Sequence, residues 1–352
     1  MGMANRPLDG KVALVAGATR GAGRGIACML GAAGAVVYGT GRSGAGQASP
    51  MARPETLEQT AALVAAQGGE GVAVRVDHTQ EEEVSALIAR ITAERGRLDI
   101  LVNDIWGGDP MIDWSARFWE LDIAKVRALV DQAVMSHLIT ARHAAPLMMR
   151  QGGGLIVEVS DGHHEGYRGQ LLYDLVKSTV NRLGYAMAWD LQGTGVTALT
   201  LCPGFLRSEA VLGHFGVSEA SWRDAIAKDP FFAESESPGF VGRAVAALAA
   251  DPAVHRKAGQ VLFAADLAEE YGFTDLDGRR PAFQPMFERV TAGLAAGRAE
   301  LDPDEHFLVL ARYRQIHREA AYADKARRLA AKLGFADLGP GLGPSPAGAV
   351  VG

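Results

Sequence analysis

The chain has 352 residues, of which 48% are hydrophobic and 22% are charged, so it can fill a core and is not an intrinsically disordered protein. Its formal net charge is −6 and its basic residues are scattered, which excludes the strongly basic nucleic-acid-binding classes. The chain has only two cysteines, and residues 1–10 are polar. No apolar run approaches the ~20 residues that a membrane span needs. These features predict a cytoplasmic protein without a membrane partner.

Short apolar runs alternate with helical patterns along most of the chain. Strands are predicted at residues 11–16, 34–39, 71–76, 98–102, 154–159, 196–201 and 260–264. Helices are predicted at residues 25–33, 54–67, 81–94, 112–149, 172–192 and 240–250. This alternation predicts an α/β fold, a doubly wound (Rossmann) seven-stranded parallel sheet covered by helices on both faces.

Two segments break the alternation. Residues 208–239 form a connection that is too long for a turn, and such connections are typical of lids and binding loops. Residues 285–297 and 304–333 have helical patterns, and the end of the chain is rich in Gly and Pro. We therefore expect a main α/β domain at 1–280, a C-terminal helical extension at 281–338 and a disordered tail at 339–352.

A glycine-rich turn, GATRGAG at residues 17–23, joins the first strand to the first helix. Glycine lets the backbone approach a diphosphate closely, and the helix N-terminus offers free N–H groups and a positive dipole to the anion. The position of the turn at a strand-to-helix junction makes this motif specific for a dinucleotide. The cofactor-binding candidates here are Gly17, Thr19, Arg20, Gly21 and Gly23.

The second strand ends near Arg42 and carries no acid that could bind the ribose 2′-hydroxyl of NAD. Arg42 and Arg20 offer two guanidinium groups, which suit a 2′-phosphate and favour NADP(H) over NAD(H). Arg42 also has the simpler interpretation of a solvated loop residue. Asp77, which follows the third strand, is either a cofactor-binding residue that contacts the adenine or a turn residue at a helix start.

Tyr173 and Lys177 are four residues apart on a predicted helix and therefore share one face. A neighbouring ammonium stabilises a phenolate and eases proton transfer from tyrosine near neutral pH. Ser160 ends a predicted strand, at the sheet edge where ligands bind in parallel sheets. Its hydroxyl can hold a substrate oxygen, so Ser160, Tyr173 and Lys177 are the catalytic candidates, and no metal site is predicted.

Together these motifs resemble the short-chain dehydrogenase/reductase family over residues 8–278. The resemblance rests on the glycine turn and on Asp77, Asn103, Ser160, Tyr173, Lys177, Pro203, Gly204 and Ser208. It implies the family's fold, a nicotinamide cofactor and the Ser-Tyr-Lys roles. It further implies that Asn103, Pro203 and Gly204 lie beside the cofactor, that Ser208 holds the carboxamide, and that Lys177 also contacts the nicotinamide ribose. A basic residue in the turn, here Arg20, again implies NADP.

The segment 251–279 also resembles the C-terminal region of a mammalian branch of this family, which implies bulky hydrophobic ketones as substrates. We therefore expect an NADP(H)-dependent oxidoreductase that reduces a ketone or aldehyde to an alcohol. Two alternatives stay open, an alcohol dehydrogenase that works oxidatively and a dinucleotide-binding sensor or scaffold. The family also implies a homodimer or homotetramer, formed through the helices at 112–149 and 172–192.

Two departures from the family pattern affect the expected cofactor site and the expected proton path. Asp104 and Trp106 stand where the family commonly has Asn and Gly after the fourth strand. The Asn that orders a relay water in many members is replaced by Ala133. His137, one helical turn later, or a backbone carbonyl with water is a candidate replacement.

Several other polar and aromatic residues have competing interpretations. Asp161, His163 and His164 follow Ser160. One interpretation is that they are metal ligands, and the other is that they line the substrate entrance or are solvated. Because no second cluster completes a metal site, we favour the interpretation without a metal. Trp114, Phe118 and Trp119 are expected in the core or an interface, and Phe231 and Phe232 either close over a substrate or pack the long connection onto the body.

Overall fold

The computed structural model describes residues 6–46, 49, 51–162 and 168–283. Its seven strands form one parallel sheet in the order β3-β2-β1-β4-β5-β6-β7. The predicted doubly wound sheet is therefore confirmed. The strands are β1 (Val12–Ala16), β2 (Val36–Gly41), β3 (Glu70–Arg75), β4 (Ile100–Asn103), β5 (Gly154–Val159), β6 (Val196–Cys202) and β7 (Val261–Phe263).

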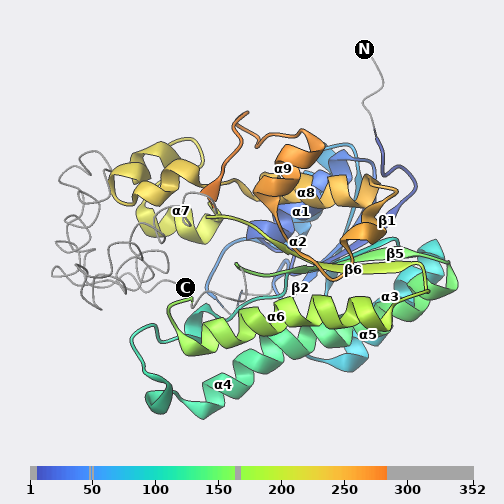
Figure 1. The fold of residues 1–352 in the computed structure, drawn as a ribbon, viewed down its shortest axis with the longest axis horizontal. Helices are drawn as coiled ribbons and strands as arrows, with labels where there is room; N and C mark the ends of the chain where they lie inside the picture. The colour runs from blue at the N-terminus through green and yellow to red at the C-terminus, as the bar shows by residue number, and fades with distance from the viewer. Residues whose placement is uncertain (1–5, 47–48, 50, 163–167, 284–352) are drawn as a thin grey trace.

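Helices cover both faces of the sheet, with α1, α8 and α9 on one side and α4, α5 and α6 on the other (Figure 1). The α-helices are α1 (Gly21–Ala32), α2 (Leu57–Ala66), α3 (Glu81–Arg95), α4 (Ile123–Val130), α5 (Ser136–Arg150), α6 (Leu171–Asp190), α7 (Glu209–Phe215), α8 (Pro238–Ala250) and α9 (Ala264–Tyr271). Between α4 and α5 lies a π-helical segment, η3 (Asp131–Met135). Short 3₁₀ segments are η1 (Asp109–Met111), η2 (Phe118–Glu120), η4 (Trp222–Ala227), η5 (Pro230–Glu234) and η6 (Val254–Lys257).

The core is split by the sheet into two buried clusters, because successive side chains of a strand point to opposite faces. On β1, Val15 packs toward α1 and α8, whereas Leu14 packs toward α3 and α5. Val102 and Leu101 divide in the same way on β4. Burial on both faces explains why the strands read as apolar runs without alternation.

Some predicted boundaries were wrong. The helix predicted at 112–149 begins only at Ile123, where the Asp122 side chain accepts a hydrogen bond from Ala124 N–H and caps it. The first helix begins inside the glycine turn, at Gly21, and α9 was not predicted. The predicted C-terminal helices and tail, from residue 285 onward, lie outside the described residues.

The long connection predicted at 208–239, which we call the lid, is folded and has a small core of its own. It contains α7, η4 and η5, and its buried side chains include Trp222, Phe231 and Phe232, packed with Phe205 and Phe283. Of the two interpretations of Phe231 and Phe232, the structure supports the one in which they pack the lid onto the body.

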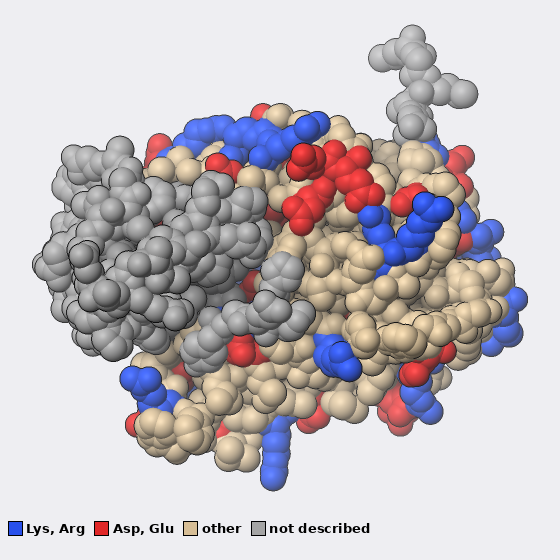
Figure 2. Space-filling view, in the orientation of Figure 1, with Lys and Arg blue, Asp and Glu red and all other residues tan. Residues whose placement is uncertain are grey.

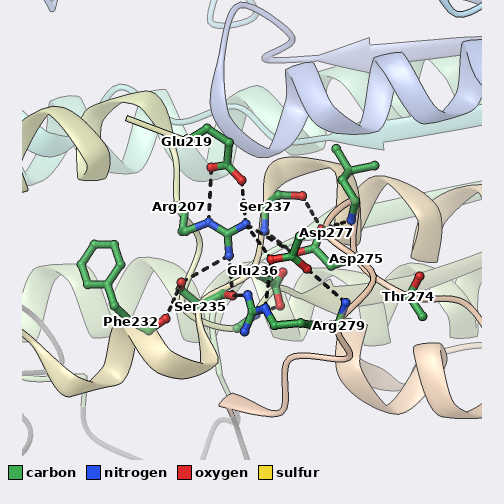
Figure 3. Close-up of polar contacts among 12 residues, drawn as sticks. Arg207, Glu219, Phe232, Ser235, Glu236, Ser237, Thr274, Asp275, Asp277 and Arg279 are labelled. Carbon is green, nitrogen blue, oxygen red and sulfur yellow. Dashed lines mark hydrogen bonds and ion pairs between the residues drawn. The ribbon is translucent and has the colours of Figure 1, made fainter. Parts of the chain in front are cut away.

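An ionic cluster around the buried Arg207 joins this lid to residues 274–279 (Figure 3). The fully buried Arg207 guanidinium pairs with Glu219 at 2.7 Å, lies 3.6 Å from Asp275 and stacks 4.4 Å from the Trp222 ring centroid. It also donates a hydrogen bond of 2.6 Å to the Ser235 carbonyl. Arg207 therefore connects two parts of the lid to the segment that follows α9.

Candidate functional site

A cavity of about 760 Å³ lies at the carboxyl ends of the strands. The strand order reverses there, between β1 and β4, which is where open parallel sheets bind ligands. Most of the predicted site residues line this cavity: Gly17, Thr19, Arg20, Gly21, Arg42, Asp77, Ser160, Tyr173, Lys177, Pro203, Gly204 and Ser208. The fold thus brings together segments that are far apart in the sequence.

The glycine turn needs its glycines for two different reasons. Gly17 and Gly21 have φ angles of +93° and +58°, in the region that disfavours side chains. A Cβ on Gly23 would lie 2.3 Å from the Gly17 carbonyl oxygen, so this position is set by packing within the turn. Gly23 does not line the cavity, among the residues that the structure describes.

An anionic group already occupies the N-terminus of α1. The Glu209 carboxylate, from the first turn of α7 in the lid, accepts a hydrogen bond of 2.8 Å from Gly21 N–H and pairs with Arg24 at 3.3 Å. The turn therefore holds a carboxylate where a dinucleotide would place its diphosphate. A diphosphate that uses Gly21 N–H must displace Glu209.

We expect the Glu209→Gln variant to bind the dinucleotide about three- to tenfold more tightly, because the neutral amide is a weaker competitor for Gly21 N–H than the carboxylate. Fluorescence titration with NADPH measures the dissociation constant. Asp224→Asn, which removes an exposed charge from η4 of the same lid, is the control and should leave the constant unchanged. Weaker binding by Glu209→Gln would mean that the carboxylate supports the cofactor site instead of competing for it.

The two predicted guanidinium groups both reach the cavity. Arg20 contacts the sulfur of Met51, and the Arg42 side chain packs over Gly107, where a Cβ would lie 2.9 Å from Nη2. Asp77 also lines the cavity, but its carboxylate accepts hydrogen bonds from Thr79 N–H at 3.0 Å and from the Thr79 hydroxyl at 2.8 Å. Asp77 therefore has the contacts of a turn residue as well as a place in the cavity.

The three catalytic candidates meet on one wall of the cavity. Ser160 follows β5, and its hydroxyl donates a hydrogen bond of 2.9 Å to the carbonyl oxygen of Lys177. The Lys177 ammonium lies 4.3 Å from the Trp106 ring centroid and 5.6 Å from that of Tyr173. The helical spacing thus places the amine beside the phenol ring, with Trp106 as a second aromatic neighbour.

Sequence reasoning missed the partner of the phenol. The Tyr173 hydroxyl donates a hydrogen bond of 2.7 Å to Asp161 Oδ2. Its ring lies between Trp106, at 5.5 Å, and Trp114, at 5.2 Å between centroids. Trp114, which was expected in the core or an interface, packs against a buried apolar cluster and also lines the cavity. The pattern offered no signal for the Asp161 contact, because the two residues come from different segments.

Asn103 and His137 belong to a buried polar cluster under the cavity. Asn103 Nδ2 donates to Glu158 Oε1 at 2.7 Å, and the His137 ring lies 2.6 Å from Glu158 Oε2 and 3.0 Å from the Ile105 carbonyl oxygen. Neither Asn103 nor His137 lines the cavity in the described part of the chain. These contacts favour a structural role for both residues.

Asp104 places an acidic group against the glycine turn. Its carboxyl accepts a hydrogen bond from Gly23 N–H, and burial raises the pKa of Asp104 to about 7, although Lys177 and that hydrogen bond favour the charged form. His78, also in the cavity wall, contacts the hydroxyls of Thr40 and Thr140, and burial lowers its pKa to about 3. His78 is therefore neutral at physiological pH.

The described residues contain no group of three or more His, Cys, Asp or Glu side chains arranged to hold a metal ion. His163 and His164 lie outside them. Within the same ranges, no helix has the length and apolar character needed to cross a membrane.

The family model for short chain dehydrogenases matches residues 11–213, which include the glycine turn and all three catalytic candidates. The chain belongs to the short-chain dehydrogenase/reductase family. Dehydrogenase/reductase SDR family member 1 of Mus musculus is 36% identical over 278 residues, covering 78% of this chain and 85% of the mouse protein. The Homo sapiens protein of the same name is 34% identical over the same shares. The predicted family and mammalian branch are thus confirmed.

A short chain dehydrogenase from Mycobacterium thermoresistibile has the same fold, with a TM-score of 0.66, 22% identity and coverage of 79% of this chain and 92% of its own. Family membership makes this short-chain dehydrogenase/reductase an oxidoreductase that interconverts CH–OH and C=O groups of a small molecule with an NAD(P) dinucleotide. The cavity residues fit that cofactor, since the α1 N-terminus already holds an anion and the guanidinium groups of Arg20 and Arg42 line the same cavity.

Proposed function

We propose that this protein is a cytoplasmic, NADP(H)-dependent carbonyl reductase that reduces a bulky, hydrophobic ketone or aldehyde, with Tyr173 as the acid. The proposal is carried by one observation: Ser160, Tyr173 and Lys177 line the same cavity as the glycine turn. The test is turnover of hydrophobic ketones with NADPH, which should depend on the Tyr173 hydroxyl. Tight NADPH binding without turnover would favour the sensor alternative.

In this proposal each side chain has a distinct task. A reduced nicotinamide held at the glycine turn would supply the hydride that the carbonyl carbon receives. Ser160 turns its hydroxyl from the Lys177 carbonyl toward the substrate oxygen and orients it. Tyr173 gives its proton to that oxygen, and the Lys177 ammonium stabilises the phenolate that forms.

The proposed substrate class is supported by the cavity wall and by one relative. Trp106, Ile112 and Trp114 give the wall beside Tyr173 an apolar, aromatic surface. A 7alpha-hydroxysteroid dehydrogenase of Clostridium sardiniense is 28% identical over 247 residues, covering 66% of this chain and 90% of its own. Both observations support a flat, hydrophobic carbonyl compound.

The preference for NADP(H) rests on Arg20 and Arg42. Arg42→Leu should weaken NADPH binding about 10- to 100-fold and leave NADH binding nearly unchanged, because a charged hydrogen bond contributes about 1.5–3 kcal/mol and only NADPH carries the 2′-phosphate. Titration of both cofactors measures this. Arg182→Leu, an exposed change on α6, is the control. An equal loss for both cofactors would contradict the assignment of Arg42 to the 2′-phosphate.

We also propose a homodimer or homotetramer formed through the helices on the α4–α6 side. The surface over α6 carries few charged side chains (Figure 2). Its large apolar side chains Leu175 and Trp189 are 48% and 58% exposed, which is typical of a contact surface. Light scattering of the purified protein checks this, and a monomeric mass would contradict it.

A further inference from the structure

Tyr173 needs a source for the proton that it gives away, and the residue that supplies the usual relay has been lost. Ala133, which stands in place of the family's relay Asn, is buried in η3 and ends in a methyl group that neither donates nor accepts a proton. His137, the candidate replacement, contacts Glu158 and the Ile105 carbonyl. Neither of these side chains lines the cavity within the described ranges.

Asp161 is the carboxyl group that contacts the phenol. Its Oδ2 lies 2.7 Å from the Tyr173 hydroxyl oxygen, a distance at which one proton can pass between the two oxygens. Asp161 is half-buried and lines the cavity, so its carboxyl can also exchange protons with water there.

The position of Asp161 is set by the surrounding structure. The buried Arg168 guanidinium donates to the carbonyl oxygens of Asp161, at 2.6 Å, and Gly162, at 3.0 Å. Asn181 Nδ2, from α6, donates to the same Gly162 carbonyl at 2.8 Å. Because α6 also carries Tyr173, these bonds hold the Asp161 backbone to the helix of its partner.

We propose that Asp161 is a further catalytic residue, which exchanges a proton with Tyr173 during each turnover. This inference rests on the proposed function. In the reduction, the Tyr173 hydroxyl turns from Asp161 to the substrate, and its O–H bond breaks as the proton goes to the substrate oxygen and a phenolate forms. The Asp161 carboxyl, protonated from the cavity water, then transfers its proton to the phenolate oxygen. Asp161 is left as a carboxylate and takes a proton from water. The hydride received by the carbonyl carbon comes from the reduced nicotinamide dinucleotide, and alcohol oxidation reverses each transfer.

The test is chemical rescue of the Asp161→Ala variant by small carboxylic acids. We expect its kcat for ketone reduction with NADPH to fall about 100-fold, within the range typical of a lost acid/base group. Formate and acetate should raise the kcat of Asp161→Ala about tenfold. The size of this rise should depend on the pKa of the added acid. Asp161→Asn keeps the size and an acceptor oxygen but has no titratable proton, so it should be similarly slow and show no rescue.

Two further variants separate this proposal from its alternatives. Asp190→Ala, at the exposed end of α6, should keep wild-type activity with and without formate. Tyr173→Phe should stay inactive in formate. NADPH binding and thermal midpoints show that each variant is folded. Wild-type activity in Asp161→Asn, or a slow Asp161→Ala enzyme that no acid rescues, would overturn the role of Asp161. An active wild type with an inactive Tyr173→Phe variant would leave the proposed function standing.

Discussion

Replacing Tyr173 with Phe is expected to lower kcat for ketone reduction by about 1,000-fold or more, while NADPH binding and stability stay close to wild type. Acid/base groups typically contribute about 10²- to 10⁴-fold to turnover, and the phenol is also the group that Lys177 and Asp161 serve. The ring keeps its neighbours Trp106 and Trp114, so the variant loses one oxygen and little packing.

Steady-state rates with a panel of hydrophobic ketones, and NADPH titration of the same samples, measure the two expectations. Tyr185→Phe is the matched control, because it removes a hydroxyl from the same helix, on a more exposed side chain next to Trp189. The control should keep wild-type rates. If the Tyr173→Phe enzyme stayed within about tenfold of the wild type, another group would have to be the acid.

Arg207→Met is expected to lower the free energy of unfolding by about 3–5 kcal/mol, the usual cost of removing one partner of a buried ion pair. Arg207 is fully buried, pairs with Glu219 and lies 3.6 Å from the buried Asp275 (Figure 3). Methionine fills a similar volume but leaves the Asp275 charge and the Ser235 carbonyl without the guanidinium.

Urea denaturation of the NADPH-free protein measures this difference. Arg223→Met is the control, because its guanidinium stacks on the same Trp222 at 4.4 Å and lies 3.8 Å from Asp277, yet its side chain is 60% exposed. Exposed pairs contribute about 0–1 kcal/mol, so this variant should be nearly as stable as the wild type. Equal losses for the two variants would show that burial does not decide the contribution of Arg207.

Local patterns of the sequence predicted the sheet, the glycine turn and the Tyr173–Lys177 pair. Each of these depends on spacing within a few residues: apolar runs of strand length, glycines at a strand-to-helix junction, and two side chains four positions apart on one helix. Such features can be recognised in the sequence however the rest of the chain is folded. The start of α4 was harder to predict, because the apolar residues at 112–121 have the pattern of a helix. The true start depends on one short-range contact, the Asp122 cap.

The tertiary structure alone decided which polar groups meet. Asp161 lies against Tyr173, and Glu209 reaches Gly21 N–H, because the loop after β5 and the lid are folded over the carboxyl ends of the strands. The Asn103 side chain donates a hydrogen bond to Glu158 in a buried cluster instead of lining the cavity. A hydrogen bond between residues distant in sequence depends on where whole elements pack, and that packing is set by the summed burial of many apolar side chains, which no local spacing encodes.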